Sequence, residues 1–301
     1  MGLRKWEGYN KIAKTLEREK DHKGEAMSGQ KTAWVTGASS GLGLHTAEAL
    51  KKDGWNVIAG ARSFEDGKKD GIWRLKLDVT DEESVRRFCG EAAKIGPPDA
   101  LVQCAGILVL GSCEETGMEE FRRVTETNYL GMVRMNRAVL PLMREKKQGK
   151  IVLFSSINGL MGIPFQSAYT ASKHAIEGYA ECLALEVKPF GIQVMLVEPG
   201  DHRSGSDLYR AHAAAMGEKS PYRKENESTV AIISRDEHNG SDPDVLGRKI
   251  ARILDRKRIP FRKRIASVDQ HLAVYVHRFL GAKVNSLVLR TYYIRKRNKQ
   301  G

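Results

Sequence analysis

Two side chains four residues apart, Tyr169 and Lys173, have the types and spacing of an acid/base pair. Residues 167–188 around them read as one long helix, and residues four apart on a helix share a face. A nearby ammonium favours the phenolate, so we expect Lys173 to lower the pKa of Tyr169 towards a range useful for proton transfer. Ser156 follows a predicted strand at 150–154 and is placed to hydrogen-bond a reacting oxygen.

The Tyr-x-x-x-Lys spacing alone is also that of an ordinary exposed helix pair. Here the intervening residues, Thr170-Ala171-Ser172, are small, and Ser155-Ser156 precede them in the chain. This setting favours the interpretation as a catalytic site.

A glycine-rich loop, Thr36 to Gly43, joins a predicted strand at 32–35 to a predicted helix at 41–52. Phosphate groups reach the backbone only where no side chain intervenes, and the N-terminus of the helix adds amide donors and a favourable dipole. Tight turns also need glycine, but the strand before and the helix after are the context of a dinucleotide site. The residues that we expect to hold the cofactor here are Gly37, Ser39, Ser40, Gly41, Leu42 and Gly43.

The end of the second predicted strand, 55–59, indicates which dinucleotide binds. An acidic residue there would bind the ribose 2′-hydroxyl of NAD, whereas an arginine pairs with the 2′-phosphate of NADP. The sequence has Arg62 and no acid before Glu65, so we expect NADP(H) in preference to NAD(H). The alternative is a solvated surface arginine.

Asp78 follows the third predicted strand, 73–77, and is expected to approach the adenine, and Val79 beside it is expected to bind the cofactor. Asp78 could instead belong to the N-cap region of the next helix, 81–93.

Strand and helix patterns alternate from Lys31 onward, which predicts an α/β fold with a doubly wound parallel sheet, a Rossmann fold. The predicted strands are 32–35, 55–59, 73–77, 100–103, 150–154 and 193–197, and the predicted helices are 41–52, 81–93, 118–128, 133–146 and 167–188. Their short apolar runs fit strands buried on both faces.

The chain divides into a single domain with additions at both ends. Residues 1–30 read as an N-terminal appendage and linker, and 31–241 as the dinucleotide-binding catalytic domain. Its last part, 201–241, is polar and irregular, as expected of a substrate loop. Residues 242–301 form a basic, mostly helical extension that we expect to pack on the same domain, with a helix at 244–254 and a strand at 259–266.

With these motifs in place, residues 31–204 resemble the short-chain dehydrogenase/reductase family. The glycine loop and the Tyr-x-x-x-Lys motif match, and Ser156 lies thirteen residues before the tyrosine, as in the family. Asn128 falls at the family's catalytic asparagine, and Pro199-Gly200 at the turn that closes over the nicotinamide. The C-terminal extension and the compact connection at 62–73 resemble the hydroxysteroid and retinol dehydrogenase-like branch.

The resemblance implies NADP(H)-dependent interconversion of a carbonyl and an alcohol on a lipophilic small molecule. Tyr169 would act as general acid or base, Lys173 would bind the nicotinamide ribose, and Ser156 would orient the carbonyl. Asn128 would hold a helix kink and a water. The further cofactor residues that it implies are Cys104, Ala105, Gly106, Tyr169, Lys173, Pro199, Gly200 and Ser204. A non-catalytic dinucleotide-sensing or scaffold protein is the alternative, disfavoured because the chain keeps both Tyr169 and Lys173.

Three departures from the family pattern stand out. Gln103-Cys104-Ala105-Gly106 replaces the family's Asn-Asn-Ala-Gly, and the purpose of Gln103 is open. Ser204 replaces a threonine and keeps a hydroxyl. Asp201-His202 stand where apolar residues are usual, and we expect His202 to be solvated, with substrate contact as the alternative. Candidate pocket residues are Met161, Ile163, Phe165 and Tyr209, any of which could equally be core.

The net charge of +13 is concentrated at the C-terminus: residues 247–301 carry 16 Lys and Arg against two Asp, and the rest of the chain 34 basic and 35 acidic residues. The tail has an apolar helical stripe around Phe279, so it reads either as a helix packed on the domain or as a peripheral contact with anionic lipid, assisted by the basic N-terminal segment. No aromatic-interleaved motif indicates nucleic-acid binding.

The remaining features point to an ordinary enzyme of the cytoplasm. The four cysteines are scattered, which indicates free thiols and no metal site. No apolar run or signal-peptide pattern is seen, so we expect a cytoplasmic protein, with the membrane surface as a possible site of attachment. The resemblance implies a homodimer or homotetramer built on helices 133–146 and 167–188.

Overall fold

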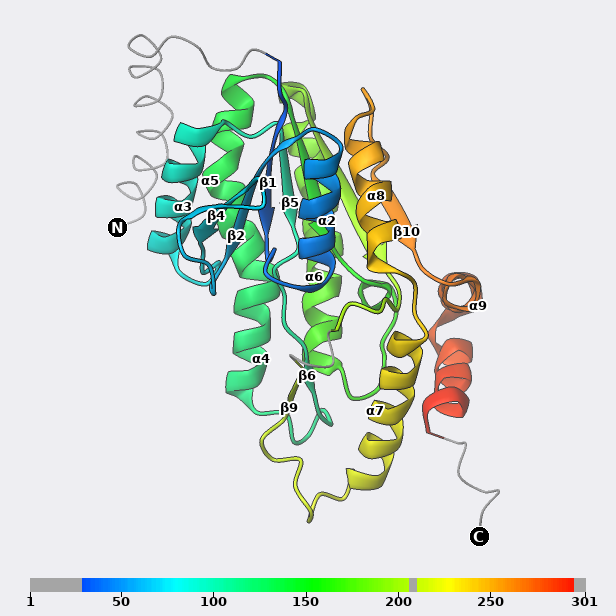
Figure 1. The fold of residues 1–301 in the computed structure, drawn as a ribbon. Helices are drawn as coiled ribbons and strands as arrows, with labels where there is room; N and C mark the ends of the chain where they lie inside the picture. The colour runs from blue at the N-terminus through cyan, green and yellow to red at the C-terminus, as the bar shows by residue number, and fades with distance from the viewer. Residues whose placement is uncertain (1–28, 206–209, 295–301) are drawn as a thin grey trace.

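The computed structural model describes residues 29–205 and 210–294, and its centre is an eight-stranded sheet (Figure 1). The strands are β1 (Thr32–Thr36), β2 (Asn56–Ala61), β3 (Gly67–Lys69), β4 (Ile72–Lys76), β5 (Ala100–Gln103), β7 (Gly149–Phe154), β8 (Ile192–Pro199) and β10 (Arg262–Ile265). Their order is β10-β8-β7-β5-β1-β2-β4-β3, and only β3 runs antiparallel to its neighbour. The predicted doubly wound parallel sheet is confirmed.

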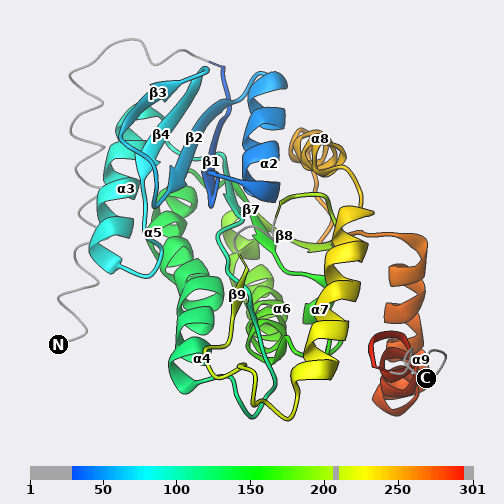
Figure 2. The ribbon, with the colours of Figure 1, turned by 60° about the horizontal axis from the view of Figure 1, so that its bottom comes forward.

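Helices cover both faces of the sheet (Figures 1 and 2). The covering helices are α2 (Gly41–Lys52) and α8 (Pro243–Leu254) on one face and α3 (Glu82–Ile95), α5 (Gly131–Glu145) and α6 (Ser167–Val187) on the other. Further helices are α4 (Met118–Thr125), α7 (Arg223–His238) and α9 (Val268–Tyr293). Alternate residues of a strand point to opposite faces. Trp34 therefore packs with side chains of α3, α5 and α6, while Val35 packs with α2 and α8.

The strand order reverses at β1, which pairs with β2 on one side and β5 on the other. Connections from the two strands leave in opposite directions and open a crevice at their carboxyl ends, the usual ligand site of such sheets. The glycine loop after β1 and the segment 104–106 after β5 both begin at this crevice.

The segment 201–241 is more regular than expected. It contains β9 (Ala211–His212), which pairs with β6 (Val109–Leu110), and the sixteen-residue α7. The buried residues of α7 are Asn226, Thr229 and Ile233. Because two of these three buried residues are polar, the sequence of α7 lacks the apolar periodicity that would predict a helix there.

The C-terminal extension contacts the preceding part of the chain through β10, α8 and α9; Val274 of α9, for example, packs with Met161. β10 adds a parallel strand beside β8, and α8 packs on α2 through Gly247, where a Cβ would lie 2.5 Å from the His45 carbonyl oxygen. α9 bends at Gly281, whose φ is +79°. The predicted appendage up to residue 28 and the basic end 295–301 lie outside the described residues.

Candidate active site

One cavity of about 870 Å³ opens at the carboxyl ends of β1, β2, β5, β7 and β8. It gathers all the predicted cofactor residues: Gly37, Ser39, Ser40, Gly41, Leu42, Gly43, Arg62, Asp78, Val79, Cys104, Ala105, Gly106, Tyr169, Lys173, Pro199, Gly200 and Ser204. Ser156 lies in the same wall, so side chains far apart in the sequence meet around a single space.

The glycine loop is shaped by contacts that exclude side chains. Gly37 has φ +69°, and a Cβ there would lie 2.6 Å from the Ala105 backbone; at Gly43 it would lie 2.3 Å from the Gly37 oxygen. Ser40, the N-cap of α2, makes no side-chain capping bond, so the first amides of α2 are left for another acceptor. These features fit a dinucleotide phosphate.

The adenosine end of the cavity contains Arg62 and Asp78. Arg62 is exposed just past β2. The Asp78 Oδ1 accepts hydrogen bonds from the Thr80 amide at 2.9 Å and the Thr80 hydroxyl at 2.7 Å. The N-cap of α3 is Asp81 rather than Asp78, since Asp81 accepts from the Glu83 amide.

Ser156 and Tyr169 are hydrogen-bonded to each other, which lowers the pKa of the phenol. Burial outweighs this bond and, together with the carboxylates of Glu237 and Asp201, raises the pKa of Tyr169 to about 12. The expected lowering by Lys173 is therefore wrong for this cavity. The reason is that desolvation disfavours the charged phenolate, and the negative charges of the nearby carboxylates disfavour it as well.

Lys173 is 5% exposed, and its Nζ lies 5.4 Å from the centre of the Tyr169 ring. It donates a hydrogen bond to the Phe154 carbonyl oxygen at 2.7 Å. Burial lowers its pKa to about 8. The lysine therefore loses its charge in a range close to neutral pH.

Asn128 lies next to this wall rather than in it, and it is fully buried. Its Oδ1 accepts a hydrogen bond from the Ile107 backbone amide at 2.7 Å. Its Nδ2 donates to the Ile107 carbonyl oxygen at 2.9 Å and to the Ser172 hydroxyl at 3.0 Å. It sits in a π-helical turn, Glu126–Leu130, that joins α4 directly to α5. The sequence instead predicts two helices, 118–128 and 133–146, with a gap between them. Asn128 thus braces the loop after β5 against the helix that carries Lys173.

Gln103, the departure whose purpose the sequence left open, faces away from the cavity. Its Nε2 donates to Asn136 Oδ1 at 2.7 Å, and Asn136 donates to the Tyr179 hydroxyl at 3.1 Å. This buried polar chain joins β5 to α5 and α6.

The loop after β8 differs most from expectation. His202 is 3% exposed and lines the cavity, so the prediction of a solvated side chain is wrong. Its Nδ1 bonds the Gly200 oxygen at 2.9 Å, and burial lowers its pKa. A backbone bridge between His202 and Ser241 holds the loop against the turn after α7, which sequence periodicity does not reveal.

The structure adds cavity residues that the sequence did not indicate: Ile107, Leu108, Asn158, Gln166, Asp201, Arg210, Ile233, Glu237 and Tyr293. Of the candidate pocket residues, Ile163 lines the cavity. Met161 is not in the wall but packs in one cluster with Ile163 and Val274, and Phe165 is not in the wall either. Tyr209 lies outside the described residues.

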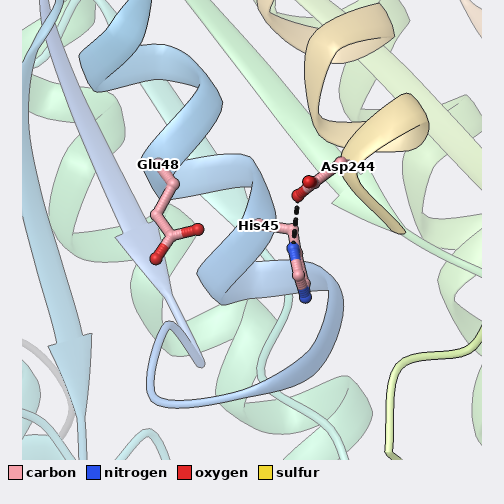
Figure 3. Close-up of side chains that lie close together, drawn as sticks. All are labelled: His45, Glu48 and Asp244. Atoms are coloured by element: carbon pink, nitrogen blue, oxygen red, sulfur yellow. Dashed lines mark hydrogen bonds and ion pairs between the residues drawn. The ribbon is translucent and has the colours of Figure 1, made fainter. Parts of the chain in front are cut away.

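A second group of polar side chains, His45, Glu48 and Asp244, lies where α2 meets α8 (Figure 3). The His45 Nδ1 bonds Asp244 Oδ1 at 2.6 Å, which holds the pKa of Asp244 below its usual value. Two of the three side chains are exposed, and His45 and Asp244 already bond each other, so we describe the group as a contact between helices.

A crevice at the strand-order reversal, a glycine loop and a Ser–Tyr–Lys wall together define a dinucleotide-dependent oxidoreductase. A sequence model of short chain dehydrogenases matches residues 31–211. The chain belongs to the short-chain dehydrogenase/reductase family, whose members use NAD(P)(H) and interconvert alcohols and carbonyls.

Curated relatives of the chain include two with named substrates. It is 38% identical to a 3-ketodihydrosphingosine reductase of Bacteroides thetaiotaomicron over 260 residues, 86% of this chain and 96% of that protein. It is 32% identical to retinol dehydrogenase 8 of Bos taurus over 255 residues, 78% of this chain and 81% of that protein.

Solved structures share the fold. A short-chain dehydrogenase from Streptomyces avermitilis is 33% identical with a TM-score of 0.72, covering 87% of this chain and 96% of that one. A variant of the actinorhodin polyketide ketoreductase, solved with NADPH, is 25% identical with a TM-score of 0.64, covering 79% of this chain and 96% of that one.

Proposed function

We propose that the protein catalyses NADP(H)-dependent interconversion of a ketone and a secondary alcohol, with Tyr169 as general acid and base. The observation that carries this is the convergence of Ser156, Tyr169 and Lys173 on the cavity that also contains the glycine loop. When bound, the reduced nicotinamide would supply the hydride. Tyr169 would donate a proton to the carbonyl oxygen, Ser156 would hold that oxygen, and Lys173 would bind the ribose and support Tyr169.

The preference for NADP(H) rests on Arg62. It is exposed at the wall of the cavity just after β2, where an acidic residue would favour NAD. The related ketoreductase structure with NADPH is consistent with this preference.

The substrate that we propose is a lipophilic ketone with a long chain, of the kind named for the Bacteroides relative. Three isoleucines of the cavity, Ile157, Ile163 and Ile233, would contact its apolar part. Loss of reduced-nicotinamide absorbance with a panel of aliphatic, sphingoid, steroid and retinoid carbonyls tests the proposal. Binding of NADPH with no turnover on any of them would favour the non-catalytic sensing or scaffold protein instead.

We further propose peripheral attachment to an anionic membrane surface through α9. Exposed apolar side chains gather on this helix and at its end: Val268, Leu272, Tyr275, Phe279, Leu280, Val284, Leu287, Val288, Tyr292 and Ile294. Arg278, Lys283 and Arg290 accompany them with Asp269 as the single acid of the helix. Among the residues that the structure describes, no helix has the length and hydropathy to cross a bilayer, so the helix would lie on the surface.

Co-sedimentation with anionic and with neutral vesicles, at low and high salt, tests this attachment. We expect binding to anionic vesicles that weakens with salt and with Phe279→Glu, while the exposed Met118 on α4, changed to Glu, serves as the control. Absence of binding at low salt contradicts the proposal, and a lipid-free dimer lost in Phe279→Glu would assign the face to a second copy of the chain. A homodimer or homotetramer through α5 and α6 stays a separate proposal, to be tested by sedimentation velocity.

A further inference from the structure

The substrate side of the cavity carries more charge than a purely lipophilic ligand would tolerate. Asp201, Arg210 and Glu237 all line it, beyond the residues assigned to the cofactor. Charged groups left against an apolar ligand lose hydration without compensation. The wall therefore indicates a ligand with a polar end close to the reacting carbonyl.

Two carboxylates face this end of the cavity. Asp201 is held in place because its Oδ2 accepts from Gln270 Nε2 at 2.5 Å and its backbone oxygen accepts from the Ser241 amide at 3.0 Å. Glu237 comes from the last turn of α7 and is paired with Arg210. Both carboxylates line the cavity that Tyr169 lines, and both raise the pKa of its phenol.

The surroundings of Asp201 also disfavour a negative charge on its own carboxyl group. Burial, together with the carboxylates of Glu237 and Asp236, raises its pKa to about 7. Neighbouring positive charge from a ligand would reverse this effect and hold Asp201 ionised.

Arg210 provides a second observation, independent of the carboxylates, that indicates a ligand. Its side chain is 3% exposed, and one nitrogen, Nη2, bonds Glu237. Its Nε and Nη1 are buried and have no hydrogen-bond partner among the described residues. Buried donors without an acceptor are costly, so a ligand oxygen, such as that of a hydroxyl group, would stabilise the side chain of this cavity-lining residue.

We propose that Asp201, Glu237 and Arg210 form a head-group subsite for a primary amino alcohol attached directly to the ketone that is reduced. The ammonium would lie against the two carboxylates, and the hydroxyl oxygen would accept from Arg210. A 3-ketodihydrosphingosine is such a compound, a long-chain 2-amino-1-hydroxy-3-ketone. This inference rests on the proposed ketone reduction and adds the recognition of the amine to it.

The test compares two matched ketones in neutral detergent micelles, 2-amino-1-hydroxyoctadecan-3-one and 1-hydroxyoctadecan-3-one, by their kcat/KM with NADPH. We expect the wild-type protein to favour the amine by at least about tenfold, and Asp201→Asn to reduce that ratio by about tenfold. Glu237→Gln provides a second variant. Glu227→Gln is the control, because Glu227 is exposed on the same helix and pairs with Arg223.

Binding of dihydrosphingosine and of octadecane-1,3-diol to the protein saturated with NADP⁺ gives a readout independent of turnover. Amine preference that falls in Asp201→Asn but not in Glu227→Gln supports the subsite. Equal use and equal binding of the matched compounds overturn the subsite while leaving ketone reduction intact. If neither ketone is reduced, the proposed activity on long-chain ketones fails, and the binding comparison still decides whether the carboxylates recognise an amine.

Discussion

Lys173 donates a hydrogen bond to the carbonyl oxygen of Phe154, 2.7 Å away, and so ties the catalytic helix α6 to the end of β7. The lysine is 5% exposed, and burial lowers its pKa to about 8. The group proposed to bind the ribose is thus also a buried cation, which the folded protein holds at a cost in stability.

We predict that Lys173→Met stabilises the protein at pH 7 while abolishing its activity. The pKa of Lys173 falls from 10.5 to about 8 on folding, which destabilises the folded wild-type protein by about 3 kcal/mol below pH 8. The variant escapes this cost but loses the hydrogen bond to Phe154, which stabilises the wild-type protein by about 1 kcal/mol. The unfolded state binds more protons between pH 8 and 10.5, so the wild-type protein gains stability there and the variant does not. Urea unfolding at pH 7 and pH 9.5 measures the difference, and a variant less stable at pH 7 would contradict the prediction.

The same pKa predicts the alkaline limb of the pH profile for ketone reduction. We expect kcat/KM to fall as the pH rises through about 8, because Lys173 then loses the charge that would bind the ribose and support Tyr169. Tyr169, with its pKa raised to about 12, stays protonated through this range and cannot cause the fall. A profile that stays flat to pH 10 would remove Lys173 from this role.

Tyr169→Phe should lower kcat by at least about 100-fold and leave the Kd for NADPH within a few-fold of the wild-type value. The change removes the proton donor and the hydrogen bond with Ser156 but keeps the ring. Tyr179→Phe is the matched control, since Tyr179 lies on the same helix and its hydroxyl accepts from Asn136, away from the cavity. Substantial turnover by Tyr169→Phe would reject the assignment of the general acid.

The sequence predicts the sheet, and it predicts which residues gather around the cavity, because both depend on local signals. The strands are short apolar runs, and the glycine loop is contiguous, so neither needs knowledge of distant contacts. Asp201, Arg210 and Glu237 were not predicted as a group because they come together only through the bridge between His202 and Ser241 and the fold of α7. The pKa of Tyr169 was predicted in the wrong direction because burial, which the sequence does not give, outweighs a neighbouring charge.

Arg62→Ala tests the cofactor preference. Loss of one guanidinium–phosphate interaction at an exposed site should weaken NADPH binding by about tenfold and change NADH binding little, because only NADPH carries the 2′-phosphate. Titration of the two nucleotides by fluorescence measures both constants. Equal weakening of both would point to a general effect on the loop, and unchanged NADPH binding would leave Arg62 as a solvated side chain.

Gln103→Asn restores the residue usual in the family and, in this chain, should destabilise the fold. The asparagine is one methylene shorter, so its amide falls short of Asn136 Oδ1, which Gln103 reaches at 2.7 Å in a buried setting. A buried acceptor left without its donor costs about 1–3 kcal/mol. We expect this loss in urea unfolding together with an unchanged Kd for NADPH, because Gln103 faces α5 rather than the cavity. The double variant with Asn136→Leu should lose less than the sum of the two single changes, since the two amides serve each other; full additivity would mean that their hydrogen bond contributes nothing.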